Sequence, residues 1–319
     1  MKVAVFNTKP YDRQFLEWAA ESNKDHELHF FKAHLSKETL PLAAGFEAVC
    51  LFVNDSVDAL MMKSLKDGDC RYIALRCAGF NNIDLEAAKT EGIKVCRVPS
   101  YSPHAVAEHT LALTLSIIRK THRAFNRVRE GNFNIDGLLG FDLNGRTVGI
   151  VGTGEIGAIV AQIFKGFNCR VIAYDPYENS KCSGLVEYVP LEEIWHQSDI
   201  ISLHCPLTPE SFHMINEESI GKMKENVTLV NTSRGALVDT NAVIKAIKSE
   251  KIGRLALDVY EEEAELFFED CSDKVIQDDS LMRLLSFPNT LITGHQAYFT
   301  KEALEQIAIT TLNNLSQWQ

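Results

Sequence analysis

The sequence lacks several features that would assign it to whole classes of protein. Its 32 basic residues are outnumbered by 43 acidic ones, and the resulting net charge of -11 would repel nucleic acid and anionic membranes. No apolar run approaches the length of a membrane span, and the run after Met1 is far too short for a secretory signal. With 45% hydrophobic and 24% charged residues, we expect a globular, cytoplasmic protein that binds neither nucleic acid nor membrane.

Disulfide and metal motifs are also missing. The eight cysteines form no CxxC pair and are scattered from Cys50 to Cys271, several of them inside strand-like runs. This pattern favours free, buried thiols in a reducing cytoplasm. His104 and His109 resemble a metal motif, but their spacing matches no zinc signature. We interpret them as the polar start of a helix near an interface and expect no metal.

Short apolar runs alternate with helical segments along most of the chain. Such alternation is typical of βαβ units and a parallel sheet. It occurs over residues 1–100 and again from Arg146, and a chain of 319 residues usually forms more than one core. We therefore predict two doubly wound α/β domains. The strand-like runs are residues 2–7, 27–31, 48–53, 72–77, 94–98, 146–152, 169–175, 186–189, 199–205, 227–231, 254–260 and 290–294.

Three further segments have a distinct character. Ser102 as N-cap and Pro103 as first helical residue predict a long helix over 102–122, apolar nearly all round and therefore buried. The acidic stretch 261–279 is interpreted as a long loop. Thr300 is a second predicted N-cap, and we expect the helix after it to cover the first domain.

Gly152, Gly154 and Gly157 form a G-x-G-x-x-G motif that follows a strand and opens a helix, the context typical of a dinucleotide site. Gly152 allows a tight turn, Gly154 lets a pyrophosphate approach, and Gly157 lets the helix pack closely. The helix N-terminus offers N–H groups and a positive dipole end to the phosphates.

Asp175 follows Gly157 by 18 residues and ends the next strand. An acid at this position accepts hydrogen bonds from ribose hydroxyls. No arginine is near to bind the 2′-phosphate of NADPH, and the negative charge of Glu178 would repel it. NADH is therefore favoured over NADPH. A glycine turn without a ligand, or a site for adenosyl-methionine, would share parts of this pattern.

Reactive residues stand at or beyond the ends of three later strands. Arg234 follows 227–231, Asp258 and Glu263 lie at and beyond the end of 254–260, and His295 follows 290–294. Because ligands bind at the carboxyl ends of parallel strands, we expect these side chains to converge beside the nicotinamide.

The chemistry of these residues fits reduction of a 2-oxo acid. Arg234 has a donor fork for a carboxylate or a carbonyl oxygen. His295 can donate a proton as hydride arrives, and Glu263 can hold its other ring nitrogen. Asp258 would orient the nicotinamide amide or Arg234. Taken singly, Arg234 could be a surface or ion-pair residue, His295 an ordinary strand-end residue, and Glu263 part of a solvated acidic loop.

The sequence resembles the D-2-hydroxyacid dehydrogenase family over essentially its whole length, and within that family the bacterial fermentative branch that reduces pyruvate to D-lactate. The motifs that carry the resemblance are YIALRCAGFNNID, VPSYSPHAVAEHT, GRTVGIVGTGEIG, DIISLHCPLTPES, NTSRGALVD, ALDVYEEE and TGHQAYFT. Many relatives have proline before the histidine, where this chain has Gly294.

The resemblance implies an NAD-dependent enzyme with Arg234 as substrate anchor and with Glu263 and His295 as acid–base pair. It also implies a set of contact residues. The substrate-binding positions are Phe52, Ala78, Gly79, Tyr101, Arg234, Tyr298 and Phe299, and the cofactor-binding positions are Gly152, Gly154, Glu155, Ile156, Gly157, Asp175, Cys205, Pro206, Ser211, Thr232, Ser233 and Asp258. Aromatic walls at Phe52, Tyr298 and Phe299 fit a methyl group.

The family pattern implies a flavodoxin-like substrate domain of residues 1–100 and 296–319, with a Rossmann NAD-binding domain of residues 101–295 inserted in it. The cleft would close at hinges near Ser100 and Gln296. The helix 102–122 and the following arm would join subunits of a homodimer or homotetramer. The alternatives are a dehydrogenase for another small 2-oxo acid and an NAD(H)-sensing, corepressor-like binding protein.

Overall fold

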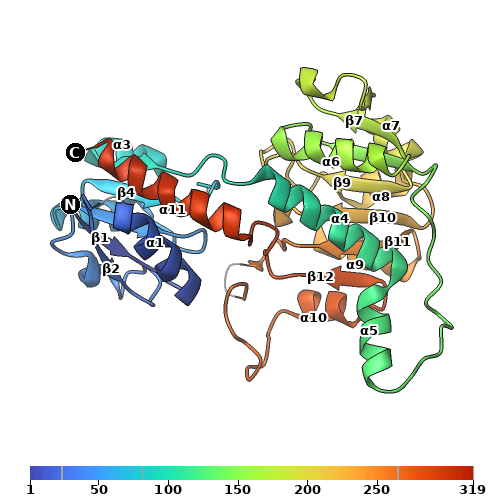
Figure 1. Cartoon of the computed structure of the whole chain (residues 1–319), viewed down its shortest axis with the longest axis horizontal. Helices are drawn as coiled ribbons and strands as arrows, with labels where there is room; N and C mark the ends of the chain where they lie inside the picture. Colours follow the sequence, from blue (N-terminus) through green and yellow to red (C-terminus); the bar gives the residue numbers. More distant parts are fainter. Residues whose placement is uncertain (23, 81, 264–265, 319) are drawn as a thin grey trace. The chain divides into compact units, whose positions relative to one another are not determined.

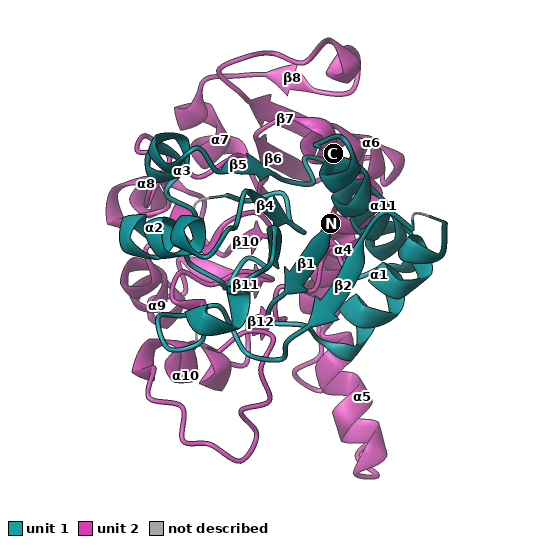
Figure 2. Ribbon diagram, turned by 90° about the vertical axis from the view of Figure 1, so that its left-hand side faces the viewer, with its two compact units in different colours: residues 1–102, 299–319 teal, residues 103–298 magenta. Residues whose placement is uncertain are grey.

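The computed structural model describes residues 1–22, 24–80, 82–263 and 266–318. The chain divides into two compact units, coloured separately in Figure 2: unit 1 comprises residues 1–102 and 299–319, and unit 2 comprises residues 103–298. Unit 2 is thus inserted in the sequence of unit 1. The functions that the sequence assigned to its two domains stay predictions.

Unit 1 contains a parallel sheet with the strand order β2-β1-β3-β4-β5, of which Figure 1 labels β1, β2 and β4. The helix α11 packs against α1 and β4, so the last segment covers the sheet formed by the first, as predicted. The strands are β1 (Lys2–Val5), β2 (Glu27–Phe30), β3 (Ala48–Leu51), β4 (Tyr72–Leu75) and β5 (Lys94–Cys96), and the helices are α1 (Pro10–Ser22), η1 (Leu40–Ala43), α2 (Ala59–Asp67), α3 (Leu85–Glu91) and α11 (Lys301–Ser316).

Unit 2 contains a larger parallel sheet with the order β12-β11-β10-β9-β6-β7-β8. The strands are β6 (Thr147–Val151), β7 (Arg170–Tyr174), β8 (Glu187–Tyr188), β9 (Ile200–Leu203), β10 (Val227–Asn231), β11 (Ile252–Leu257) and β12 (Thr290–Ile292). The helices are α4 (Pro103–Arg119), α5 (Thr121–Arg129), α6 (Glu155–Gly166), η2 (Ser180–Cys182), α7 (Leu191–Gln197), α8 (Glu217–Lys222), η3 (Gly235–Leu237), α9 (Thr240–Lys248) and α10 (Asp279–Ser286).

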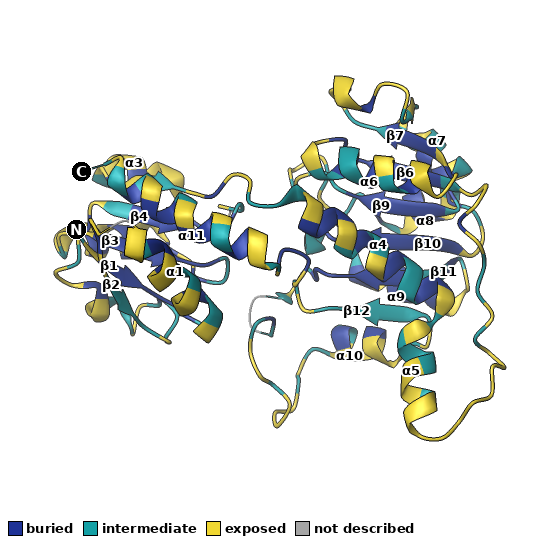
Figure 3. Cartoon of the chain, in the orientation of Figure 1, coloured by how far each residue is buried: buried dark blue, intermediate teal, exposed yellow. Residues whose placement is uncertain are grey.

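The sheet of unit 2 is buried on both faces. In β10, all five residues are buried, and its successive residues Leu229 and Val230 belong to separate hydrophobic clusters. Successive side chains of a strand point to opposite faces, so helices must cover both sides. The cluster around Val230 includes side chains of α4 and α6, and the one around Leu229 includes side chains of α7, α8, α9 and α10. Figure 3 shows the resulting dark-blue central strands between helices with exposed outer faces.

Each strand expected from the sequence is present, and the predicted fold class of two parallel α/β domains is confirmed. Several strands are shorter than the apolar runs that predicted them. For example, β4 ends at Leu75, although the run continues to Cys77. An apolar run indicates which residues are buried, not how far the strand's hydrogen bonds extend. Buried loop residues after the strand end therefore lengthen the run.

The long helix predicted over 102–122 is shorter and only partly buried. It ends at Arg119 because Lys120 takes a left-handed φ of 52°, after which α5 begins. Leu113 and Ile117 lie on its buried face, while Leu111 remains partly exposed in the isolated chain. None of the helices in the described residues is long and apolar enough to cross a bilayer.

All eight cysteines lie in the described ranges, and each is a free thiol. Five of them are buried: Cys50, Cys70, Cys77, Cys169 and Cys182. Burial raises the pKa of the Cys50 thiol to about 11, so this group stays protonated. The prediction of free, mostly buried thiols is confirmed.

Thr300→Ala should destabilise unit 1 by weakening the start of α11. The Thr300 side chain accepts the Ala303 N–H, as the sequence predicted. Its loss should lower the free energy of unfolding by about 1 kcal/mol. Urea unfolding measures this change, and Thr300→Ser, which keeps the hydroxyl, is the matched control. Equal unfolding midpoints for the two variants would contradict the capping role.

Candidate active site

The predicted cofactor and catalytic residues of unit 2 follow the carboxyl ends of its strands. In this sheet, β6 to β8 extend to one side and β9 to β12 to the other, so the topological switch lies between β6 and β9. Open parallel sheets bind ligands at such a switch. On one side of the switch, β6 is followed by the residues from Gly152 to Gly157, and β7 by Asp175. On the other side, β9 is followed by Cys205, Pro206 and Ser211, and β10 by Thr232, Ser233 and Arg234. Then β11 is followed by Asp258, and β12 by His295.

The turn between β6 and α6 fits a dinucleotide pyrophosphate. Gly152 has a φ of 95°, and a Cβ there would lie 2.6 Å from the backbone N of Cys205. A Cβ on Gly157 would lie 2.0 Å from the carbonyl oxygen of Gly152, so neither position has room for a side chain. Gly154 faces open space, and no side chain of the described residues caps α6 there. The N-terminus of α6 is therefore suited to bind an anion.

Asp175 is held in place at the end of β7. Its Oδ2 accepts hydrogen bonds from the backbone N–H of Thr153 (2.6 Å) and from the Thr153 hydroxyl (3.1 Å). Its Oδ1 accepts the N–H of Tyr177 (2.9 Å). A carboxylate oxygen has two lone pairs, so the group can also accept from ribose hydroxyls.

The loops after β9 and β10 are joined to each other. The Ser233 hydroxyl donates to the carbonyl of Cys205 (2.7 Å), and the Ser211 hydroxyl donates to that of Pro206 (2.8 Å). The first bond places Ser233 beside Cys205, and the second lies within the loop after β9. The contacts of these residues with the cofactor stay predictions.

Arg234 is presented by a turn that Asn231 organises. The Asn231 side chain donates to the carbonyl of Arg234 (2.8 Å) and accepts the N–H of Ser233 (3.0 Å). Gly235 follows, and a Cβ there would lie 2.1 Å from the carbonyl carbon of Tyr260. The guanidinium donates to the Ser233 carbonyl (2.7 Å) and has no carboxylate partner among the described residues. Its other donors remain for an anionic ligand.

His295 and Glu263 form a hydrogen-bonded pair. The Nδ1 of His295 lies 2.7 Å from Oε1 of Glu263, while Oε2 of the same carboxylate accepts the N–H of Tyr260 (2.9 Å). Because a carboxylate only accepts, Nδ1 carries a proton, and Nε2 is the nitrogen left for a substrate. Both side chains are about one-fifth exposed, 20% and 18%. Glu263 therefore lies in an ordered pair and not in a freely solvated loop.

Two aromatic rings lie near this pair within unit 2. The Phe268 ring centroid is 5.6 Å from that of His295, and the Tyr298 ring meets His295 edge-on at 6.5 Å. Tyr298 was among the predicted substrate residues. Nothing in the sequence singles out Phe268, because it lies in the acidic stretch and belongs to no motif.

The carboxylate of Asp258 is fully buried and organises the turn that carries His295. Its Oδ1 accepts the Thr293 hydroxyl (2.5 Å) and the Gln296 N–H (3.0 Å), and its Oδ2 accepts the Ala297 N–H (2.8 Å). His295 itself has a φ of 52°, in the left-handed region, and donates its N–H to the Asp258 carbonyl (2.7 Å).

These bonds keep the carboxyl of Asp258 charged although it is buried. Burial by itself would raise the pKa of its carboxyl, but hydrogen bonds from His109, Thr293 and Ala297 outweigh burial and hold the pKa below its ordinary value. No hydrogen bond joins the carboxylate to Arg234 among the described residues. The expected role of Asp258, to orient the nicotinamide amide or Arg234, stays a prediction.

Unit 1 carries other predicted substrate residues at the carboxyl edge of its own sheet. Phe52 follows β3, Ala78 and Gly79 follow β4, and Tyr101 follows β5. No described residue accepts the N–H of Ala78 or Gly79, which leaves both donors for an anion. The ring of Phe299 meets Tyr11 edge-on at 4.8 Å in the same unit.

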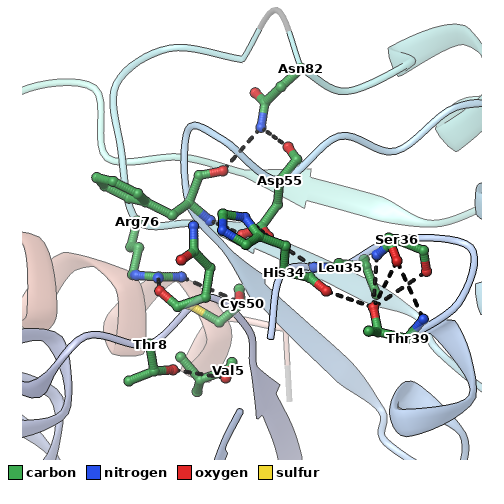
Figure 4. A network of polar contacts seen from close by, with 12 residues as sticks. Val5, Thr8, His34, Leu35, Ser36, Thr39, Cys50, Asp55, Arg76 and Asn82 are labelled. Atoms are coloured by element: carbon green, nitrogen blue, oxygen red, sulfur yellow. Dashed lines mark hydrogen bonds and ion pairs between the residues drawn. The ribbon is translucent and has the colours of Figure 1, made fainter. Parts of the chain in front are cut away.

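A buried polar network holds Phe52 in place, and Figure 4 labels its members Asp55, Arg76 and Asn82. Asp55 accepts the Phe52 N–H (2.8 Å), and the side-chain amide of Asn82 donates to the Phe52 carbonyl (3.1 Å). The Arg76 guanidinium lies 5.1 Å from the centre of the Phe52 ring. Burial disfavours its charge, but neighbouring groups, above all Asp12 at 3.3 Å, outweigh burial and raise the pKa of Arg76. Sequence reasoning missed this network, because its members lie in four separate segments.

Known proteins resemble the chain over its full length. Residues 111–297 match the sequence model described as D-isomer specific 2-hydroxyacid dehydrogenase, NAD binding domain. The D-lactate dehydrogenase of Escherichia coli K12 is 52% identical, covering 99% of this chain and 96% of its own. The structure of the pyruvate reductase of Chlamydomonas reinhardtii has a TM-score of 0.94 at 42% identity, and the match covers 100% of this chain and 96% of that one. The structure of the D-lactate dehydrogenase of Aquifex aeolicus, complexed with NAD and lactic acid, has a TM-score of 0.88 at 34% identity. The match covers 99% of this chain and 95% of that one.

Asp175→Ala should weaken NADH binding and reduce the preference for NADH over NADPH. Hydrogen bonds to a charged group contribute about 1.5–3 kcal/mol, so the NADH dissociation constant should rise about 10- to 150-fold. Titration of nicotinamide fluorescence measures both constants. Glu178→Ala removes an exposed acid nearby and should keep NADH affinity. Unchanged NADH affinity in Asp175→Ala would remove Asp175 from the cofactor site.

Proposed function

Because the chain belongs to the D-isomer specific 2-hydroxyacid dehydrogenase family, we propose that it reduces pyruvate to D-lactate with NADH. The chain is an NAD-dependent oxidoreductase, so the predicted family, enzyme class and cofactor are confirmed. The finer proposal is carried by the hydrogen bond between His295 and Glu263, at the same sheet edge as Arg234 and the dinucleotide turn.

In this proposal, the three polar residues divide the chemistry of carbonyl reduction. Bound NADH supplies the hydride. Arg234 directs its guanidinium donors at the carboxylate, the carbonyl oxygen or both, which holds the 2-oxo acid and polarises its C=O bond. His295 donates the Nε2 proton to the carbonyl oxygen, and Glu263 stabilises the imidazolium before the transfer. The product is a 2-hydroxy acid, and His295 regains its proton from water.

The proposed preference for a small 2-oxo acid rests on the aromatic residues. The family resemblance assigns Phe52, Tyr298 and Phe299 to the substrate's methyl group, and aromatic side chains would disfavour a phosphate or a second carboxylate there. The N–H groups of Ala78 and Gly79 and the side chain of Tyr101 would bind the substrate carboxylate. D-stereochemistry follows the resemblance to the D-isomer specific family.

The two units take separate roles in the proposal. Unit 1 is the substrate domain, and unit 2, which carries the dinucleotide turn, is the NAD-binding domain. Fermentation in the cytoplasm is the proposed setting, and the eight free thiols suit its reducing conditions.

The test is an assay with NADH and a panel of 2-oxo acids, followed by chiral analysis of the product. Loss of nicotinamide absorbance with pyruvate and formation of D-lactate are the expected results. L-lactate would contradict the proposed stereochemistry. A clearly higher kcat/KM for phenylpyruvate, 2-oxobutyrate, hydroxypyruvate or glyoxylate would assign a different substrate. Saturable NADH binding without any turnover would favour an NAD(H)-sensing binding protein.

Arg234→Lys should impair the reaction while sparing the cofactor. Lysine keeps the charge but loses the planar fork, so KM for pyruvate should rise and kcat should fall, each about tenfold or more. The NADH dissociation constant should stay nearly unchanged. Steady-state kinetics combined with NADH titration separate these effects, and unaltered kinetics would rule out Arg234 as the anchor.

Glu263→Gln should lower kcat for pyruvate reduction. The Glu263 carboxylate accepts the Nδ1 proton of His295 (2.7 Å), and a neutral amide makes a weaker hydrogen bond to a charged imidazole. The loss of a hydrogen bond to a charged group should lower kcat about 10- to 150-fold, which steady-state kinetics measures. An unaltered kcat would mean that Glu263 does not support the proton donor.

We also propose that the chain forms a homodimer or homotetramer through the arm after α5. Phe133, Ile135 and Leu139 are 75%, 79% and 86% exposed, an unusual density of open apolar side chains. Leu139→Asp should lower the molar mass measured by light scattering. Val275→Asp, at another open apolar residue of unit 2, should leave the mass unchanged. A Leu139→Asp variant with the wild-type mass would exclude this residue from the contact.

A further inference from the structure

His109 reaches from α4 to the turn that carries the proton donor. Its Nε2 lies 3.2 Å from the Thr293 hydroxyl and 3.3 Å from Oδ1 of Asp258. The imidazole is mostly buried, with 18% of the side chain exposed. The sequence pattern predicted only a polar helix start near an interface at His109, yet its ring contacts Thr293 and Asp258 at the catalytic edge of unit 2.

The hydrogen-bond pattern determines which nitrogen of His109 carries a proton. The Asp258 carboxylate can only accept, and the Thr293 hydroxyl uses its single hydrogen for that carboxylate. Both neighbours of Nε2 therefore present lone pairs. Nε2 must be protonated, so His109 acts as a donor in its neutral as well as its charged form.

This donor adds to a set that Asp258 needs. A fully buried carboxylate is stable only when its lone pairs accept hydrogen bonds. Besides His109, the donors to Asp258 are the Thr293 hydroxyl and the N–H groups of Gln296 and Ala297. His109 is the donor that comes from outside the turn. It ties the turn to α4, a helix of the rigid core.

The next residue of α4 makes a similar connection. The Thr110 hydroxyl lies 2.8 Å from that of Thr232, in the loop that presents Arg234. Two consecutive residues of one helix thus contact the loops of both the proton donor and the substrate anchor.

We propose that His109 is a positioning residue, which acts through Asp258 and Thr293 to hold the turn that aims His295. This proposal rests on the proposed function, since it assumes that His295 donates the proton. It assigns a role to a histidine that makes no contact with the reacting atoms.

The experiment compares His109→Leu with His109→Gln. Leucine fills similar space without a donor, whereas the Gln Nε2 amide can donate from nearly the same place. We expect kcat for pyruvate to fall about 10- to 100-fold in His109→Leu, the range for a lost hydrogen bond to a charged group, with NADH affinity unchanged within about twofold. His109→Gln should recover most of kcat, and His196→Leu, an exposed histidine on α7, should behave as wild type.

A double-mutant cycle with His295→Ala tests whether the effect passes through His295. If it does, adding His109→Leu to His295→Ala should change the residual kcat by less than about twofold. Hydrogen exchange of the apoprotein gives a readout independent of turnover, and the amides of Gln296 and Ala297 should exchange faster in His109→Leu.

The outcomes separate this proposal from the proposed function. An active wild type with an unaltered His109→Leu, no recovery by His109→Gln, or fully additive effects in the cycle would each overturn the positioning role alone. A wild type that reduces no 2-oxo acid would overturn the proposed function and, with it, the assignment of His109 to proton transfer.

Discussion

The buried carboxylate of Asp258 is the interaction on which the catalytic edge of unit 2 depends. A single charged group at the end of β11 accepts hydrogen bonds from Thr293 and from two backbone N–H groups, and so bends residues 293–297 around itself. Only with this bend does His295 take its left-handed φ and direct its Nδ1 at Glu263. The hydrogen bonds stabilise the buried charge of Asp258, and the charge in turn holds the donating groups in place.

Close approach of backbone segments is the second constraint on the site. At Gly152, Gly157 and Gly235, the place of a Cβ is taken by the backbone of another segment. Gly152 lets the turn after β6 pass close to the backbone of His204 and Cys205 after β9. Gly157 brings α6 against the end of β6, where the helix can face a pyrophosphate. The third lets the Arg234 turn pass beside Tyr260, whose N–H holds Glu263. The anchor and the acid–base pair are thus connected through one stretch of backbone.

Unit 1 uses buried charge in the same way at the edge of its own sheet. Arg76 is almost fully buried against Asp12, and its guanidinium lies near the ring of Phe52. Asp55 and Asn82 hold the Phe52 backbone from both sides. A buried ion pair is costly unless its geometry is complete, so residues so arranged are suited to keep one aromatic side chain in a fixed position.

The sequence by itself determined the strands, their parallel class, the dinucleotide turn and the presence of Arg234, Glu263 and His295 beyond strand ends. These features depend on local periodicity and on residues within one or two turns of each other, which a single sequence displays. The tertiary structure alone decided the partners of Asp258, the place of Phe268 and the direction of the His109 ring. His109 and Thr293 lie 184 residues apart, and their contact depends on how α4 packs across the sheet. Packing distances of this kind leave no local pattern, so the support of the site became visible only in the folded chain.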